Sequence, residues 1–232
     1  MDLRTLRKRV DDYTAKLNRA SAWPGGVKLI AVTKNVAADV INMAYEAGVR
    51  DIGENRVQEW REKAPSLNPG FRLHMIGQLQ TNKVKYIINH AALIHSLDRP
   101  ALAREIDSRA QAAGRRLPVL VQVNIGREAQ KAGVDESELP DFLAYVGAMP
   151  GLEVSGLMAI LPEADDPEEV RPLMRRMRAL FDDSRLRAIE GVTMRELSMG
   201  MSHDCMVAAS EGATMIRIGT ALFGPRRYEE VN

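Results

Sequence analysis

The sequence predicts a (β/α)8 barrel of the TIM type, within the α/β class, with an extra helix at its N-terminus. Short runs of β-branched and apolar residues alternate with longer helical patterns, eight such runs can be placed, and 232 residues is close to the length that this fold needs. A doubly wound open sheet is the alternative, because it uses the same alternation of strands and helices. No repeat, low-complexity tract or Gly/Ser-rich linker divides the chain, so we expect a single domain over residues 1–232.

The segment over residues 1–20 is expected to form a helix that packs on the barrel. Its apolar residues recur at intervals of three and four positions, which places them on one face of a helix. The basic residues between them are typical of a solvated face, because no aromatic or binding-module pattern accompanies them; a nucleic-acid contact is the alternative. The apolar residues are Leu3, Leu6, Val10, Tyr13 and Leu17.

The strands follow in order, each a short run rich in apolar and β-branched residues. The first is LIAVT, which is followed at once by a lysine. Because these runs alternate with helical patterns, they are typical of a parallel sheet. The expected strands cover residues 29–33, 50–53, 71–76, 92–96, 118–124, 152–160, 194–198 and 214–219.

Helical patterns fill the intervals between these strands. Gly48, Gly114 and Gly212 come directly after three of the patterns, at the position where a helix commonly ends. The expected helices cover residues 38–47, 56–63, 80–89, 99–113, 136–148, 167–189 and 204–211.

Composition excludes several classes of function. Thirty-two basic and 31 acidic residues leave a formal charge of +1, so no overall field favours a nucleic acid or a membrane. The single cysteine, Cys205, allows no intramolecular disulfide, which fits a reducing compartment. The first ten residues, MDLRTLRKRV, lack the apolar core of a signal peptide, and no run approaches the roughly 18 apolar residues of a membrane span. We therefore expect a soluble, cytoplasmic protein.

Chemistry-bearing residues stand at the ends of the expected strands. In barrels of this kind the functional site lies at the C-terminal ends of the strands, so these residues are expected to meet at one mouth. They are Lys34, Glu54, Asn55, His74, Asn124, the run from Ser198 to Ser202, and the run from Arg217 to Thr220.

The ends of the last two strands favour a phosphate site. In such barrels the loops after strands seven and eight frequently hold a phosphate. Ser202 comes before an expected helix, and Gly219 with Thr220 offers close backbone approach and a hydroxyl. The alternative is that Ser202 and Asp204 only cap the helix and that Gly219 is a turn glycine.

Lys34 is a candidate for imine formation. A lysine at the rim of a barrel, partly removed from water, has a lowered pKa and a larger neutral fraction, which attack on an aldehyde or ketone requires. A carbonyl compound that carries a phosphate would satisfy both ends of the mouth. The alternative is an ordinary solvated lysine.

Taken together, the motifs resemble those of the pyridoxal phosphate homeostasis family, which is similar in fold to the N-terminal barrel of alanine racemase. The resemblance runs in order across nearly the whole chain. The matching segments are LIAVTKN, IGENRVQE, LHMIGQLQTNKVKYI, VLVQVNIGREAQKAGV, GLMAI, ELSMGMSHD and MIRIGTALFGPRRY.

The resemblance implies that Lys34 carries pyridoxal 5′-phosphate as an internal aldimine. It also implies that Arg217 faces the pyridine nitrogen, and that other residues surround the cofactor. Two positions depart from the family pattern: Leu73 replaces a frequent tryptophan and Ala213 a frequent serine. The expected phosphate contacts are Ser202, Gly219 and Thr220, and the residues expected near the cofactor are Asn55, His74 and Ser198.

Arg217 bears on whether the protein is a catalyst. Arginine can only donate hydrogen bonds, so it keeps a ring nitrogen unprotonated and makes the ring a poorer electron sink. In alanine racemase, the resemblance implies, a second domain of the partner subunit supplies a tyrosine that works opposite the lysine. Here the chain ends at Asn232, soon after Phe223, and no segment for that task is expected.

The leading hypothesis is therefore a protein that stores, supplies or delivers pyridoxal phosphate without robust catalysis, with no catalytic residue. Apo forms of pyridoxal phosphate-dependent enzymes are the expected recipients. One alternative is a single-domain amino-acid racemase or lyase in which His74, His203 or Tyr228 acts as the second base. Another is a Schiff-base aldolase that acts on a phosphorylated sugar.

Three further expectations concern metals, surface lysines and assembly. The four histidines and Cys205 show no metal-ligand spacing, so we expect no metal site. Lys83 and Lys131 follow barrel strands and are expected to be solvated, with a role in cofactor transfer as the alternative. Because no partner-supplied base is expected, we predict a monomer.

Overall fold

The computed structural model describes residues 1–126 and 132–224, and in it eight parallel strands form a closed barrel in the order β1 to β8. The ring closes where Lys28 to Ala31 pair with Met215 to Ile218. This pairing confirms the predicted barrel and excludes the open sheet. The strands are β1 Lys28–Val32, β2 Asp51–Glu54, β3 Arg72–Met75, β4 Ala91–Leu97, β5 Leu117–Gln122, β6 Leu152–Met158, β7 Val192–Ser198 and β8 Met215–Ile218.

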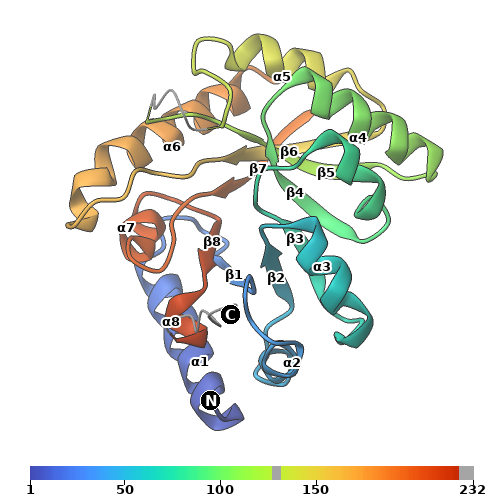
Figure 1. Ribbon diagram of the computed structural model, residues 1–232. Helices are drawn as coiled ribbons and strands as arrows, with labels where there is room; N and C mark the ends of the chain where they lie inside the picture. The colour runs from blue at the N-terminus through green and yellow to red at the C-terminus, as the bar shows by residue number, and fades with distance from the viewer. Residues whose placement is uncertain (127–131, 225–232) are drawn as a thin grey trace.

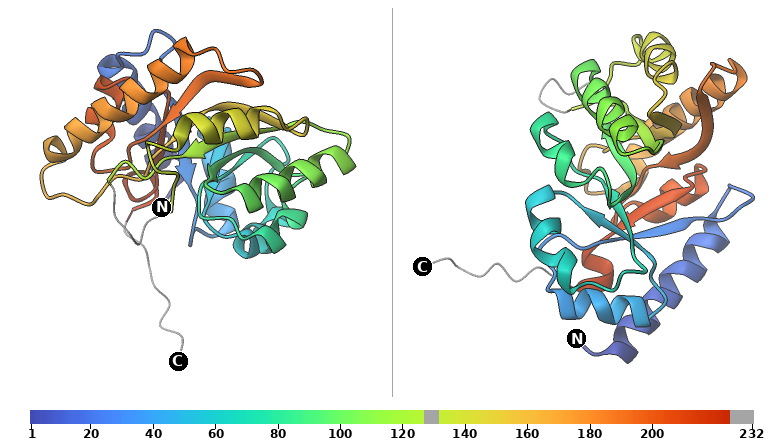
Figure 2. Two further views of the ribbon diagram at one scale, coloured as in Figure 1. Left: turned by 90° about the horizontal axis from the view of Figure 1, so that it is seen from above. Right: turned by 90° about the vertical axis from the view of Figure 1, so that its right-hand side faces the viewer.

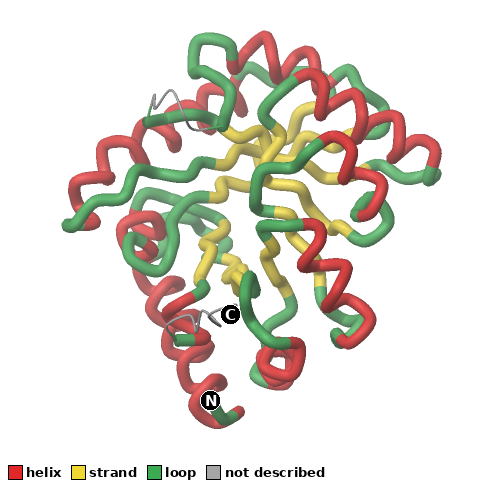
Figure 3. The backbone as a smooth tube through the Cα atoms, in the orientation of Figure 1, coloured by secondary structure: helices red, strands yellow, loops and turns green. Residues whose placement is uncertain are grey.

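Helices surround this ring of strands, as Figures 1 and 3 show. The α-helices are α1 Leu3–Ala20, α2 Ala38–Glu46, α3 Val57–Lys63, α4 Pro100–Ala112, α5 Leu139–Gly147, α6 Arg171–Leu186, α7 Cys205–Ser210 and α8 Thr220–Phe223; the 3-10 helices are η1 Ala64–Ser66, η2 Thr81–Tyr86 and η3 Pro167–Val170. No helix among the described residues is both long and apolar enough to cross a membrane.

The expected helix over residues 80–89 is instead the 3-10 helix η2. Its turns are closed by bonds between residues three apart, from the Lys83 amide to the Gln80 carbonyl and from the Ile87 amide to the Val84 carbonyl, both 3.0 Å. Threonine, asparagine and valine are weak α-helix formers, and the connection from β3 to β4 is short. The expected helix over 167–189 likewise divides into η3 and α6.

Two apolar layers stabilise the barrel. The larger lies between the strands and the surrounding helices, and it includes Ala31 and Ile52. Because successive side chains of a strand point to opposite faces, Ile30 points into the barrel. There it packs with residues from four other strands, Leu93, Leu120, Met158 and Met215.

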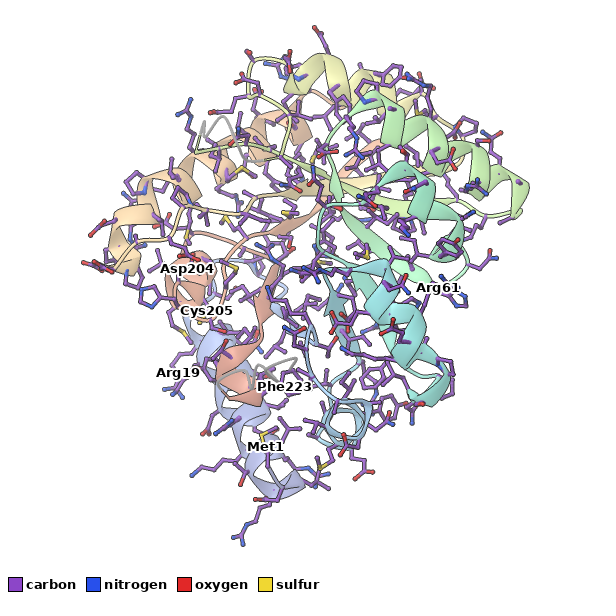
Figure 4. The ribbon with its side chains drawn as sticks, viewed as in Figure 1. Met1, Arg19, Arg61, Asp204, Cys205 and Phe223 are labelled. Carbon is purple, nitrogen blue, oxygen red and sulfur yellow. The ribbon has the colours of Figure 1, made fainter. Side chains whose placement is uncertain are left out.

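Helix α1 packs against α2, α7 and α8, as predicted for its apolar face. Leu6 and Leu17 are fully buried, and the Arg9 side chain donates a 2.8 Å hydrogen bond to the carbonyl of Leu222 in α8. Figure 2 shows the course of α1 along this side of the molecule. Figure 4 shows Arg19, in the last turn of α1, near Cys205 at the start of α7. The N-terminal helix therefore supports α8, which lines part of the mouth.

Candidate functional site

Lys34 lies at the C-terminal mouth of the barrel, two residues past Val32, the last residue of β1. Val32 and Lys34 both line a hollow of about 530 Å³, together with Gly219 and Thr220 from the end of β8. Lys34 is half-buried, and it follows the strand alternation that also directs Ile30 and Val32 inward. The structure thus brings Lys34 together with two of the three expected phosphate contacts.

The peptide groups on both sides of Lys34 are held by side chains from α3. The Lys63 ammonium donates to the Thr33 carbonyl at 2.7 Å, and the Glu59 carboxylate accepts a hydrogen bond from the Asn35 amide. Lys63 also contacts Glu59 at 2.6 Å, so the two side chains form one clamp. Asn35 has a φ of 59°, a left-handed conformation that asparagine tolerates better than most residues. The chain turns sharply at that point, directly after Lys34.

Glu54 is buried behind this clamp. Its Oε1 accepts a 2.6 Å bond from the Thr33 hydroxyl and lies 3.3 Å from the Lys63 ammonium, whereas its Oε2 has no partner among the described residues. Burial raises the pKa of this carboxyl above its usual value of 4.5, and the bonds from Thr33 and Lys63 only partly oppose the increase. Glu54 is therefore a buried acid whose charge depends on Lys63.

The hydroxyl of Ser202 joins the loop after β7 to the loop after β8. It accepts hydrogen bonds from the Gly219 amide at 3.3 Å and from the Ala221 amide at 3.5 Å. Asp204 accepts a separate bond from the Met201 amide at 2.6 Å. Ser202 thus does not act as a cap of its own helix, which was the alternative, and a cradle of hydroxyl and amide groups forms where the phosphate site was expected.

Arg217 is buried on the inner side of β8. Its Nη1 donates to the Ser198 hydroxyl at 2.6 Å, and its Nη2 donates to the Ala159 carbonyl at 2.9 Å. Its Nε makes no hydrogen bond with the described residues. Burial lowers the pKa of this guanidinium to about 10, so it remains a cation at neutral pH. Arg217 is therefore held at both terminal nitrogens, and its Nε–H remains as a donor.

A continuous hydrogen-bonded chain runs from Arg217 through the barrel, and we call it the interior column. The His95 Nδ1 lies 3.0 Å from the Ser198 hydroxyl, the His95 Nε2 lies 2.9 Å from the His74 Nδ1, and the His74 Nε2 lies 2.9 Å from Asp51. All of these side chains are buried. The interior column consists of Arg217, Ser198, His95, His74 and Asp51.

Opposite influences set the charges in the interior column. Burial raises the pKa of Asp51, but hydrogen bonds from His74 and Arg72 outweigh it and lower that pKa to about 2. Burial, together with the positive charge of neighbouring groups, holds the pKa of His95 well below 6.5. Asp51 is thus a carboxylate and His95 a neutral imidazole near neutral pH.

The remaining predicted residues are placed as follows. Asn55 is half-buried directly after β2, and its backbone lies so close to Gly77 that only glycine fits there. His203 bonds the Asp165 carbonyl at 3.0 Å and lines a separate hollow of about 600 Å³. Lys83 lies near the ring of Tyr86. Lys131 and Tyr228 lie outside the described residues.

Metal binding finds no support among residues 1–126 and 132–224. No group of three or more histidine, cysteine, aspartate or glutamate side chains there has an arrangement that suits a metal ion. The absence of a metal site stays a prediction.

Sequence reasoning missed His95, Asp51, Glu59 and Lys63. His95 carried one signal, because it is a polar residue on the inward side of a largely apolar strand, whereas Asp51 lies in a short strand that also contains Glu54 and carried none. Glu59 and Lys63 carried none, since a surface helix with charges four residues apart is common.

The chain is similar to known proteins in both sequence and fold. The model of the alanine racemase N-terminal domain family matches residues 2–227. A pyridoxal phosphate homeostasis protein of Aquifex aeolicus is 45% identical over 211 residues, 90% of this chain and 92% of that protein. Another, from Pseudomonas aeruginosa, is 36% identical over 229 residues, 97% of each chain.

Solved structures agree with these relatives. PipY of Synechococcus elongatus, 36% identical, superposes with a TM-score of 0.86 without pyridoxal phosphate and 0.84 with it bound, over 94% of this chain and 100% of PipY. Alanine racemase of Corynebacterium glutamicum, at 18% identity, shares the fold with a TM-score of 0.75. The match covers 100% of this chain and 64% of the racemase. The barrel, the matched family model and relatives of this identity and coverage together establish that the chain belongs to the pyridoxal phosphate homeostasis protein family.

Proposed function

We propose that this protein binds pyridoxal 5′-phosphate, holds it through an imine bond to Lys34, and stores, supplies or delivers it without robust catalysis. The observation that carries the proposal is the meeting of Lys34 with the Ser202 cradle at one mouth, beside an arginine with a spare donor. The family's name and the pyridoxal phosphate bound in PipY support the choice of ligand.

The residues at the mouth fit the three polar parts of this ligand. The amides and hydroxyl around Ser202 and Gly219, with Thr220 beside them, suit a phosphate. The spare Nε of Arg217 suits the lone pair of a pyridine nitrogen. Lys34 supplies the amine, which condenses with the aldehyde of the ligand and releases one water. When bound, the ligand would supply an electrophilic carbon and an electron-accepting ring.

Two features argue against a catalyst with an efficient second base. Arg217 has no acceptor atom, so it cannot hold a proton on the ring nitrogen that would strengthen the ring as an electron sink. Both nitrogens of His74 are engaged within the interior column, and the Nε2 of His203 bonds a carbonyl. His74 therefore offers no unengaged nitrogen to a substrate.

Delivery, location and assembly belong to the same proposal. We assign the apo forms of pyridoxal phosphate-dependent enzymes as recipients, the cytoplasm as location, and the monomer as the working unit. Transfer to such an enzyme faster than release into buffer would support direct delivery, and equal rates would argue for supply through free solution. Sedimentation of the loaded protein tests the monomer.

The decisive experiment is the visible spectrum of the protein with pyridoxal phosphate, before and after borohydride. We expect an imine band that borohydride bleaches, with the reduced adduct on Lys34. Lys34→Ala should form no stable adduct, whereas Lys8→Ala, which removes an exposed lysine of α1, should behave as wild type. A wild-type protein without the band, or an adduct on another lysine, would contradict the proposal.

A second measurement separates carrier from catalyst. Amino acids incubated with the loaded protein in deuterated water should keep their α-protons over times in which a racemase or lyase would exchange them. Rapid exchange that depends on Lys34 would favour the single-domain enzyme instead.

A further inference from the structure

The interior column connects the expected ring-nitrogen donor to the opposite end of the barrel. Asp51 and His74, its last members, line a cavity of about 220 Å³ at the N-terminal opening of the strands. Arg217, its first member, holds its place in the interior through Ser198 and the Ala159 carbonyl. The interior column thus has one end at a cavity of the N-terminal opening and the other at the proposed ligand site.

The direction of every hydrogen bond in the column follows from its ends. Asp51 is a carboxylate and only accepts, so a neutral His74 carries its proton on Nε2 and accepts at Nδ1. His95 must then donate from Nε2 and accept at Nδ1, where the Ser198 hydroxyl is its donor. The Ser198 oxygen in turn accepts from Arg217. With both histidines neutral, each donor between Arg217 and Asp51 has one acceptor.

One added proton reverses the middle of this chain. When His74 gains a proton on Nδ1, it becomes a donor to the Nε2 of His95. The single proton of His95 must then sit on Nδ1 and point at the Ser198 oxygen. The neutral column carries three protons, on His74 Nε2, His95 Nε2 and Ser198 Oγ. The protonated column carries four, of which the fourth comes from solvent.

The protonated column weakens the hold on the Arg217 guanidinium in two ways. The Ser198 oxygen now accepts from both Arg217 and His95, so its own proton has lost the acceptor that held it. The imidazolium of His74 also adds a second positive charge to the interior that already holds the guanidinium, where a low dielectric strengthens repulsion.

We propose that the interior column is a proton-linked switch that sets how firmly Arg217 is held at the position of the ligand's ring nitrogen. The proposal rests on the function proposed above. By linkage, a ligand that needs Arg217 in place binds less tightly as the pH falls, and its binding opposes uptake of the proton. The proton enters at the N-terminal opening, so it need not pass the ligand.

Other charged groups face the switch at the N-terminal opening, and each lies in an ion pair. At the N-terminal opening, Arg72 is paired with Asp51 at 2.5 Å, and Lys28 is paired with Glu196 at 3.3 Å. Arg195 lines the same cavity and pairs with Glu153. Because these cations already have carboxylate partners, His74 and His95 are the groups whose protons rearrange.

Nitrogen NMR of the protein labelled at its histidines tests the switch without any ligand. In the state in which both histidines are neutral, His74 and His95 should each carry the proton on Nε2. On acidification, His95 should change to the Nδ1 form in the same step in which His74 becomes an imidazolium. A His95 that keeps its proton on Nε2 until the protein unfolds, or that becomes an imidazolium itself, would overturn the proposal.

Binding of pyridoxine 5′-phosphate tests the link to the site. This probe has the ring and phosphate but no aldehyde, so its affinity does not depend on an imine at Lys34. His95→Asn keeps an acceptor for Ser198 and cuts the link to His74. Between about pH 8 and about pH 6, wild-type affinity should fall about tenfold more than the affinity of this variant. His90→Asn, at an exposed histidine, should follow wild type.

For each protein, the affinity at about pH 8 is divided by the affinity at about pH 6. If this ratio differs by less than about threefold between wild type and His95→Asn, the switch is overturned; a larger difference supports it. Wild-type protein that binds no pyridoxine 5′-phosphate at either pH would instead contradict the part of the proposed function that assigns the phosphate to the Ser202 cradle and the ring nitrogen to Arg217. The NMR measurement then decides the switch alone, as it does if His95→Asn fails to fold.

Discussion

The ammonium group of Lys63 lies 2.7 Å from the carbonyl oxygen of Thr33. Thr33 directly precedes Lys34, and the amide that follows Lys34 is bound by Glu59, which Lys63 also contacts. A helix on the outside of the barrel thereby fixes the backbone on both sides of the lysine at the mouth. The position of the Lys34 amine consequently depends on two charged side chains that do not line the hollow at the mouth.

Lys63→Met should lower the free energy of unfolding by about 3 kcal/mol at about pH 7, because it leaves the buried Glu54 without its cation. The raised pKa of Glu54 gives the pH dependence its sign. As the pH falls, Glu54 takes up a proton in the folded state and no longer needs Lys63. Urea denaturation should show a smaller loss at about pH 5. Lys85→Met, at an exposed lysine of η2, serves as control, and a loss that does not vary with pH would contradict this account.

Asp51→Asn should cost about 2 kcal/mol of stability at neutral pH. The folded pKa of Asp51, about 2, lies below its usual value of 3.8, so its ionised form stabilises the fold above that value. The contribution is lost as the pH falls from about 4 to about 2. Wild type and variant should therefore converge in acid. Asp11→Asn, at an exposed carboxyl of α1, should match wild type throughout; a constant gap between wild type and Asp51→Asn would count against the pKa assignment.

Leu17→Ala tests whether α1 is an integral part of the barrel. Leu17 is fully buried, so its truncation should cost about 3 kcal/mol in chemical denaturation. Leu186→Ala makes the same change at a residue that is 85% exposed, and it should alter stability by less than about 0.5 kcal/mol. Equal effects of the two variants would mean that α1 is not held as described.

Cys205 should react slowly with thiol reagents in the folded protein. Its side chain is buried, and burial, with the charge of Asp204, raises the pKa of the thiol. Because the thiolate is the reactive form, we expect modification at least about 100-fold slower than for the urea-unfolded chain. The kinetics can be followed by absorbance. Comparable rates in the two states would show that α7 opens readily.

Ser202→Ala should weaken binding of pyridoxal phosphate by about tenfold while the fold is retained. The hydroxyl that bridges the two loops is lost, but the Gly219 and Ala221 amides remain. Fluorescence titration measures the affinity, and Ser108→Ala, on the exposed side of α4, controls for a general effect of removing a hydroxyl. Unchanged affinity in Ser202→Ala would remove Ser202 from the proposed phosphate site.

The strands were predictable because most are short runs rich in apolar and β-branched residues, and all eight expected runs overlap observed strands. Their ends were less so: residues 118–124 and 152–160 were expected as strands, but β5 ends at Gln122 and β6 at Met158. In the sequence, a residue just beyond the last strand hydrogen bond looks the same as a residue within the strand. The single-domain assignment for residues 1–232 stays a prediction.

The interior column was beyond sequence reasoning because it depends on register. The register of β3 against β4 shifts after Leu73, so that His74 pairs with Leu93. His95 therefore lies two residues beyond the partner of His74, within reach of its ring. Alternation along one strand predicts whether a side chain points into or out of the barrel, but not which residue of the neighbouring strand it pairs with. Lys34, Ser202 and Arg217 were found because each stands at or near the end of a strand, where this pairing matters less.

Closure of the barrel between β1 and β8 also sets the order in which the sheet can be completed. The two strands that meet there lie at opposite ends of the described sequence, residues 28–31 against residues 215–218. During synthesis, β1 therefore exposes one edge of unpaired backbone groups until nearly the whole chain has emerged. We expect slow final folding and a nascent chain that benefits from chaperone protection, since contacts of such long sequence separation form late.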